Sequence, residues 1–160
     1  MPSNSPLRNI LWVAIGATVY YALLGFVYSR APYTSMKTRD ATCACGQLSV
    51  RCVGDPSSIS LCHCLQCQKR TGSAFGLAAF FERGVVTVEG KASDFARPSE
   101  SGFEVVFHFC ETCGSTVYWE PERKREFIAV AVGCFAEPGF PMPSKSVFKE
   151  HQHPWISLPI

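Results

Sequence analysis

Seven of the nine cysteines in this 160-residue chain fall into three short clusters. We call them the first pair (Cys43 and Cys45), the triplet (Cys62, Cys64 and Cys67) and the last pair (Cys110 and Cys113). Cysteines separated by one or two residues typically converge on one soft cation, most often zinc. A structural zinc site is closed by four protein ligands, whereas a site with three protein ligands keeps one position for water or substrate. Seven thiolates therefore predict two zinc ions per chain with different roles.

Two partitions of the clusters fit the sequence. A zinc ribbon would combine Cys64 and Cys67 with the last pair, and it would leave Cys62 and the first pair unused. The other partition joins the first pair to the last pair and leaves the triplet alone. Gly46 and Gly114 follow the final cysteine of the two pairs, and glycine permits the positive φ of a tight turn around a metal. These matching glycines favour a closed four-sulfur site and an open three-sulfur site.

Disulfides and an iron–sulfur cluster are the alternatives to zinc. Cysteines this close in sequence rarely pair with each other, their number is odd, and no cleavable secretory signal is evident. The spacings match no iron–sulfur run. Cys52 and Cys134 lie in apolar, strand-like runs, where a free cysteine packs as a small hydrophobic residue. We expect these two to be buried and to have no role in metal binding.

The order of the clusters and the residues around them resemble the family of glutathione-dependent formaldehyde-activating enzymes, which also includes the zinc domain of centromere protein V. The resemblance covers about residues 40–158, and it is carried by the segments 43–46, 62–75, 109–115, 132–135 and 153–156. It implies a small all-β, Mss4-like zinc-binding fold of packed antiparallel sheets. It also implies a structural zinc on the first and last pairs and a catalytic zinc on the triplet. One departure is Ser146, where many members have histidine.

Three thiolates give a divalent zinc site about one negative charge. Such an electron-rich zinc is a poorer Lewis acid than a three-histidine zinc, so it is less able to form hydroxide and better suited to bind a fourth sulfur. Coordination deprotonates a thiol, and the thiolate is the nucleophile. The resemblance implies a carbon–sulfur lyase that adds the thiol of glutathione to formaldehyde and forms S-hydroxymethylglutathione. The alternative is a non-catalytic zinc-binding interaction module. Lys69 or Arg70 could meet a carboxylate of glutathione, although such side chains are more often solvated surface charges.

The histidines are not expected to bind metal. His63 stands between two cysteines of the triplet, and its side chain should point away from them because neighbours in an extended segment point in opposite directions. His108 is expected to be exposed or to support the site from a distance. We interpret His151 and His153 as surface residues near a proline-terminated tail.

Short apolar or aromatic runs, separated by glycine, proline or charged residues, predict that strands dominate residues 42–160. The expected strands lie near residues 48–52, 85–88, 103–109, 116–119, 127–132 and 146–148. Leu65–Thr71 is expected to form a helical turn after the triplet. The net charge is +2, and no basic stripe interleaves with aromatic residues, so we expect no nucleic-acid partner.

An uncharged apolar run over residues 10–28 precedes this domain. As a helix it would reach about 28 Å, which is close to the hydrocarbon thickness of a bilayer. A signal peptide would need a cleavage site of small residues, and this segment has only a poor one. An amphipathic surface helix would need a polar face, which the run lacks. We therefore expect a hydrophobic transmembrane helix within residues 1–30, a polar linker over 31–41 and the zinc-binding domain over 42–160.

The orientation of this single-pass membrane protein follows from its basic residues. Arg30, Lys37 and Arg39 come after the run, and Arg8 comes before it. The positive-inside rule then predicts a zinc domain that faces the cytosol, where a reducing environment keeps thiolates free. A cytoplasmic protein without an anchor is the alternative.

Overall fold

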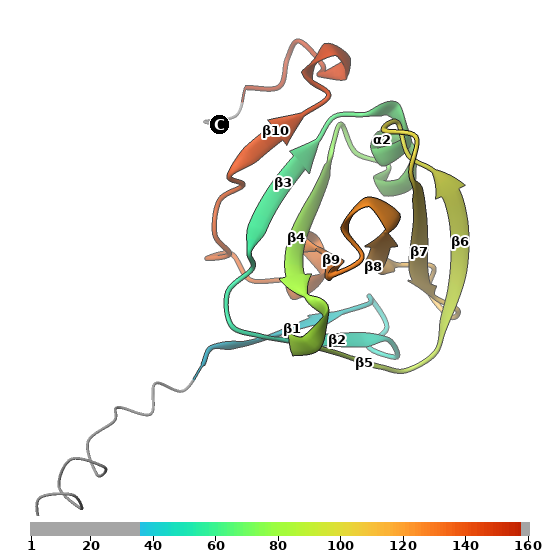
Figure 1. Cartoon of the computed structure of the whole chain (residues 1–160), viewed down its shortest axis with the longest axis vertical. Coiled ribbons are helices and arrows are strands. Elements are labelled where there is room, and N and C mark those ends of the chain that lie inside the picture. Colours follow the sequence, from blue (N-terminus) through green and yellow to red (C-terminus); the bar gives the residue numbers. More distant parts are fainter. Residues whose placement is uncertain (1–35, 158–160) are drawn as a thin grey trace, which may run out of the picture. The chain divides into compact units, whose positions relative to one another are not determined.

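The computed structural model describes residues 36–157, and strands dominate this part of the chain (Figure 1). The strands are β1 (Thr38–Thr42), β2 (Ser49–Val53), β3 (Ser58–Cys62), β4 (Gly76–Glu82), β5 (Val86–Glu89), β6 (Ala92–Pro98), β7 (Glu104–Cys110), β8 (Thr116–Pro121), β9 (Phe127–Ala131) and β10 (Lys145–Val147). The α-helix α2 (Leu65–Thr71) follows β3. Short 3-10 turns are η1 (Arg83–Val85), η2 (Glu122–Lys124), η3 (Val132–Phe135) and η4 (Lys149–His151). The prediction of a mostly β protein is confirmed for the described residues.

The strands form two sheets. A three-stranded antiparallel sheet has the order β1-β2-β5, and a seven-stranded sheet has the order β10-β3-β4-β9-β8-β7-β6. Figure 1 shows the smaller sheet at one end of the larger one and α2 at the other end. The pairs are antiparallel except for β10, which lies parallel to β3 with Ser146 opposite Leu61. The expectation of antiparallel sheets therefore holds for β1 to β9 and fails at β10.

The larger sheet is apolar on both faces. Along β4, Ala79 and Phe81 belong to a cluster that also contains Val50 and Cys52 of β2, so this face packs against the smaller sheet. Successive side chains of a strand point to opposite faces. Ala78 accordingly belongs to a second cluster on the other face, with members Val105, Phe107, Trp119 and Ala129. This second face forms the floor of the cavities described below.

Helix α2 is short because both of its ends are fixed locally. The Sγ of Cys64 accepts a hydrogen bond from the backbone N–H of Cys67, as an N-cap side chain does. At the other end, Gly72 has a φ of 63° and its N–H donates to the carbonyl of Gln68. A left-handed glycine is the common way to end a helix. The chain then returns into β4, which pairs with β3 so that Gly76 lies opposite Cys62.

The predicted transmembrane helix falls in the run over residues 10–28, which lies outside the described residues. Within residues 36–157, no helix is long and apolar enough to cross a bilayer. Helix α2 has seven residues, whereas a span needs about 20. We therefore correct the predictions of a membrane anchor and of a single-pass membrane protein with its zinc domain facing the cytosol, because the described part of the chain provides no spanning helix.

Candidate metal centres and the adjoining cavities

The structure brings the seven clustered cysteines into two groups. The thiols of the first pair and the last pair lie within 4.8 Å of one another, and those of the triplet do the same. Both groups could hold a metal ion. The nine cysteines all lie in the described part of the chain, and every one is a free thiol. The zinc-ribbon partition and a disulfide framework both disagree with this grouping.

Two equivalent turns build the four-cysteine group. The first pair lies in the turn between β1 and β2, and the last pair lies in the turn between β7 and β8. Gly46 has a φ of 79° and Gly114 has a φ of 73°, which is the left-handed conformation that glycine adopts without steric strain. The N–H of Gly114 donates to the carbonyl of Cys110, and the N–H of Gly46 donates to the carbonyl of Cys43. Each glycine thus closes its turn directly after a pair of sulfurs.

The sulfur positions of the four-cysteine group fit zinc. The Sγ atom of Cys45 lies 3.5 Å from that of Cys43 and 3.6 Å from that of Cys110. A tetrahedral zinc with Zn–S bonds of about 2.3 Å would space its sulfurs by about 3.8 Å. The backbone N–H of Leu48 also points at the Sγ of Cys43, at 3.2 Å. Such donors stabilise thiolate ligands.

The triplet spans the junction between β3 and α2. Cys62 is the last residue of β3, Cys64 caps the helix, and Cys67 lies in its first turn. Cys64 is buried, whereas Cys62 and Cys67 are partly exposed. Three convergent thiols suit zinc with one coordination position left for an outside ligand.

Ionisation of the triplet is uneven in the absence of a metal. A hydrogen bond from the Cys62 thiol lowers the pKa of Cys67 to about 6, and the same contact raises the pKa of Cys62. The group thus readily carries a first negative charge and resists a second, since like charges close together disfavour ionisation. A divalent cation is what allows all three sulfurs to be thiolates at once.

A small cavity of about 110 Å³ opens directly on the triplet. At about 30 Å³ per water molecule, it has room for three or four waters. The buried rings of Phe107 and Trp119 form part of its wall, and Arg70, Arg97 and Glu100 also line it. The space beside the sulfurs therefore admits a thiol group and a very small second reactant.

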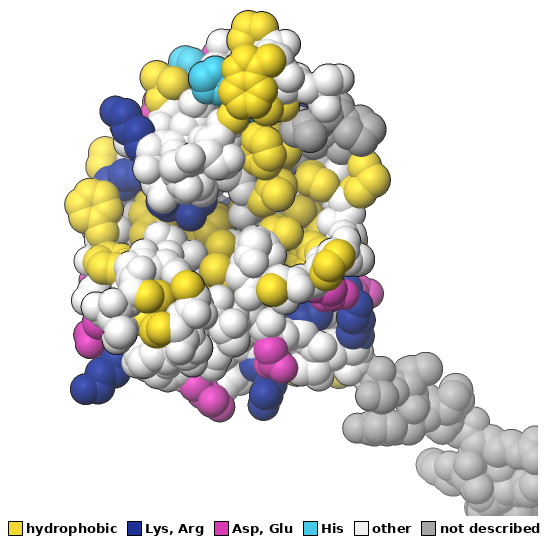
Figure 2. All heavy atoms as spheres, turned by 180° about the vertical axis from the view of Figure 1, so that it is seen from behind, with side chains coloured by type: hydrophobic (Ala, Val, Ile, Leu, Met, Phe, Trp, Pro, Cys, Tyr) yellow, Lys and Arg dark blue, Asp and Glu magenta, His cyan; other side chains and the backbone are white. Residues whose placement is uncertain are grey.

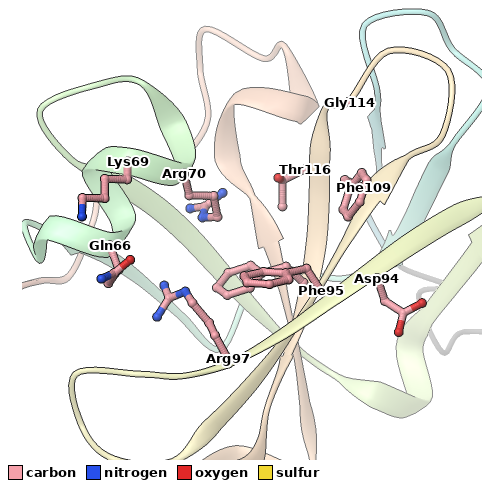
Figure 3. Close-up of a pocket in the computed structure, with 10 residues that line it drawn as sticks. Gln66, Lys69, Arg70, Asp94, Phe95, Arg97, Phe109, Gly114 and Thr116 are labelled. Carbon is pink, nitrogen blue, oxygen red and sulfur yellow. The ribbon is translucent and has the colours of Figure 1, made fainter.

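A larger cavity of about 530 Å³ shares Arg70, Arg97 and Phe107 with the small one. This volume is typical of a site for a small molecule. Figure 2 shows a hollow with apolar side chains at its floor and basic side chains at its rim. In Figure 3, Lys69 and Arg70 reach the cavity from α2, and Arg97 reaches it from β6. The two cavities together connect the triplet with a basic and aromatic recess.

Arg70 differs from the solvated surface charge that we expected as the commoner case. Its guanidinium carbon lies 4.5 Å from the ring centroid of Trp119 and 5.5 Å from that of Phe107. Burial lowers the pKa of Arg70, but an arginine side chain in a protein keeps its positive charge at neutral pH. Lys69 is exposed, as expected.

The histidines hold the region around the triplet together. His63 is buried, and its Nε2 lies 3.2 Å from the Oγ of Ser146 on β10. Ser146 is thus the partner of His63. The Nε2 of His153 lies 3.0 Å from the Oε1 of Gln68 on α2, so the interpretation of His153 as a simple surface residue is wrong. The side-chain amide of Gln68 also donates to the carbonyls of His63 and His151.

The remaining residues singled out in the sequence lie away from the triplet. Cys52 is fully buried, as expected. Cys134 is only partly buried against the same core, and its thiol donates to the carbonyl of Thr116. His108 stacks on Tyr118, and its Nε2 lies 3.2 Å from the Oε1 of Glu120. Sequence reasoning missed Arg97 and Trp119, because neither has a local motif around it.

Comparisons with known proteins identify a family for this chain. The sequence profile of the family described as glutathione-dependent formaldehyde-activating enzyme matches residues 38–152. A crystal structure of a Rhodobacter sphaeroides protein aligns with 64% of this chain and 90% of that chain, at 19% identity and a TM-score of 0.47. No curated protein matches the chain. The family match covers most of the described residues and both cysteine groups, and the chain therefore belongs to the family of glutathione-dependent formaldehyde-activating enzymes.

Proposed function

We propose that this protein is a zinc-dependent carbon–sulfur lyase that promotes the addition of the glutathione thiol to formaldehyde. The observation that carries the proposal is the triplet itself, where three convergent thiols face a cavity of about 110 Å³. Family membership supports glutathione and formaldehyde as the reactants. Formaldehyde has two non-hydrogen atoms, so it suits a space this small beside a sulfur.

The two cysteine groups take different roles in this proposal. The four-cysteine group would hold a structural zinc, because all four tetrahedral positions are filled by the protein. Cys62, Cys64 and Cys67 would hold the second zinc, which when bound would supply the positive charge that ionises the incoming thiol. The chain's own contribution is to fix these sulfurs at a strand end and a helix start. Phe107 and Trp119 exclude water from one side of the site.

The reaction balances without an oxidant or a reductant. The sulfur of glutathione forms a bond to the carbon of formaldehyde, and the π electrons of the carbonyl move to its oxygen. The thiol loses one proton and the new alkoxide takes up one proton, so no net proton is gained or lost. Nothing is oxidised or reduced, and the product is a hemithioacetal. The residues therefore need to ionise, orient and shield the thiol, and they need no redox chemistry.

Exchange NMR can test the proposal, because glutathione and formaldehyde also combine without an enzyme. We expect full-length, zinc-loaded protein to accelerate the exchange between free and hydroxymethylated glutathione. Cys67→Ser should return the exchange to the unaided rate. Cys52→Ser is the matched control, since this buried cysteine lies outside both groups, and it should retain the acceleration.

Two outcomes would contradict the proposal. Equal exchange rates with wild type and with Cys67→Ser at stoichiometric protein would remove the lyase and would favour the alternative of a non-catalytic zinc-binding module. Acceleration with another thiol and none with glutathione would show that the substrate is wrong.

A further inference from the structure

Two arginines line both cavities, and neither forms an ion pair with a carboxylate of the described residues. Arg70 comes from α2 and Arg97 from β6, and both guanidinium groups lie over the ring of Phe107, at 5.5 and 5.0 Å from its centroid. Figure 3 shows the two side chains entering the same recess from different elements. After the hydrogen bond from Cys62, the charges of Arg70 and Arg97 also lower the pKa of Cys67, so the triplet balances part of their positive charge. Two cationic side chains that line one recess still favour the binding of a further anion there.

No carboxylate of the described residues forms an ion pair with either arginine. Arg97 donates one hydrogen bond, to the carbonyl of Pro98. The buried Nε of Arg70 has no hydrogen-bond partner in residues 36–157. Glu100 lines the small cavity and Asp94 the large one. In Figure 3, Asp94 points away from the arginines.

We propose that Arg70 and Arg97 form a binding site for a carboxylate, and that this site selects thiols that carry a carboxylate. The inference rests on the proposed function, because it places the sulfur of the same substrate at the triplet. Arginine suits the role because its planar guanidinium can donate two parallel hydrogen bonds to a carboxylate. The aromatic contacts hold both guanidiniums in place before the ligand arrives.

The shared lining of the two cavities agrees with one extended ligand. Both cavities are lined by Arg70, Arg97 and Phe107, so a molecule with its sulfur in the small cavity must pass the arginines to reach the large one. The large cavity adds the aromatic walls Phe95 and Phe109. Its volume of about 530 Å³ leaves room for the rest of a short peptide.

Calorimetry with a thioether probe can test this site separately from catalysis. S-methylglutathione has both carboxylates but no thiol to ionise, and its dimethyl ester has neither carboxylate free. We expect full-length, zinc-loaded protein to bind the acid at least about tenfold more tightly than the ester, which is the effect of one charge-assisted hydrogen-bonded pair. Arg97→Met should remove most of this preference, and Arg97→Lys should retain part of it.

Arg123→Met is the matched control. Arg123 also lies over an aromatic ring, that of Phe103, and its loss changes the net charge by the same amount. It does not line either cavity, so this variant should bind both probes as the wild type does. Circular dichroism of each variant establishes that it is folded.

The outcomes separate the carboxylate site from the lyase. Equal binding of acid and ester, no binding of the acid at millimolar concentration, or an unchanged preference in Arg97→Met would each overturn the carboxylate site. Accelerated exchange in NMR together with any of these results would leave the lyase standing without this site. A clear preference for the acid in a protein that does not accelerate exchange would support the carboxylate site and refute the lyase.

Discussion

Cys110→Ser should unfold the domain under conditions where the wild type is stable. Cys110 is fully buried, and its Sγ lies 3.6 Å from that of Cys45, which is 65 residues earlier in the chain. A metal ion held by the four-cysteine group would close a loop of this length and would stabilise the folded state by about 4 kcal/mol through loop-closure entropy alone. Domains of this size have a total free energy of unfolding of about 5–15 kcal/mol. Loss of the cross-link therefore removes a large part of the stability.

Thermal melts followed by circular dichroism, with zinc in slight excess, provide the assay. We expect the melting temperature of Cys110→Ser to fall by at least about 15 °C, since 1 kcal/mol corresponds to roughly 4 °C in a domain of this length. Cys67→Ser removes one ligand of the open group and leaves the distant cross-link intact, so its melting temperature should change by less than half as much. A Cys110→Ser melt within a few degrees of the wild type, or equal shifts in the two variants, would refute the reasoning.

Three further predictions follow from the packing and the two cysteine groups. Elemental analysis should find two zinc ions per folded chain. A chromogenic chelator should remove the metal of the triplet before that of the four-cysteine group, and simultaneous loss of both metals would contradict this order. A Cβ added at Gly76 would lie 3.0 Å from a terminal nitrogen of Arg70 and 3.3 Å from the Cβ of Cys67, so Gly76→Ala should speed release of the triplet metal about tenfold, through overpacking of about 1–3 kcal/mol. Arg39→Met should lower the free energy of unfolding by about 2 kcal/mol in urea titrations, because the buried guanidinium forms ion pairs with Asp55 and Glu137. Arg51→Met, which breaks an exposed ion pair with Asp40, should change the free energy of unfolding by less than about 1 kcal/mol.

The grouping of the cysteines was predictable because its signal is local. Two or three sulfurs within a few residues already form most of a metal site, and the next residue decides whether the chain can turn around it. Gly46 and Gly114 have the positive φ that the sequence pattern indicated. Alternation along β2 and the residue before it was also readable, since Leu48, Val50 and Cys52 are all fully buried. These features depend on neighbours in sequence, which a single chain displays directly.

The walls of the cavities were not predictable, because they depend on which strands lie side by side. Arg70 has a polar, helical neighbourhood in sequence, and only the position of Trp119 on β8 makes it an aromatic-stacked residue. Arg97 enters the site because β6 pairs with β7, so that Arg97 lies opposite Val105. His153 is 85 residues from its partner Gln68. The parallel pairing of β10 with β3 likewise follows from the long irregular connection before it, which no periodicity describes.

The contacts of Gln68 have a consequence for the order in which the protein is completed during synthesis. The four-cysteine group contains no residue after Cys113, so it can assemble on the ribosome as soon as that residue has emerged. Helix α2, by contrast, is held through Gln68 by His151 and His153, which leave the ribosome about 40 residues later, or several seconds at ordinary rates of translation. The nascent chain can thus bring the four cysteines together early, whereas the triplet becomes fixed only when the tail has been made.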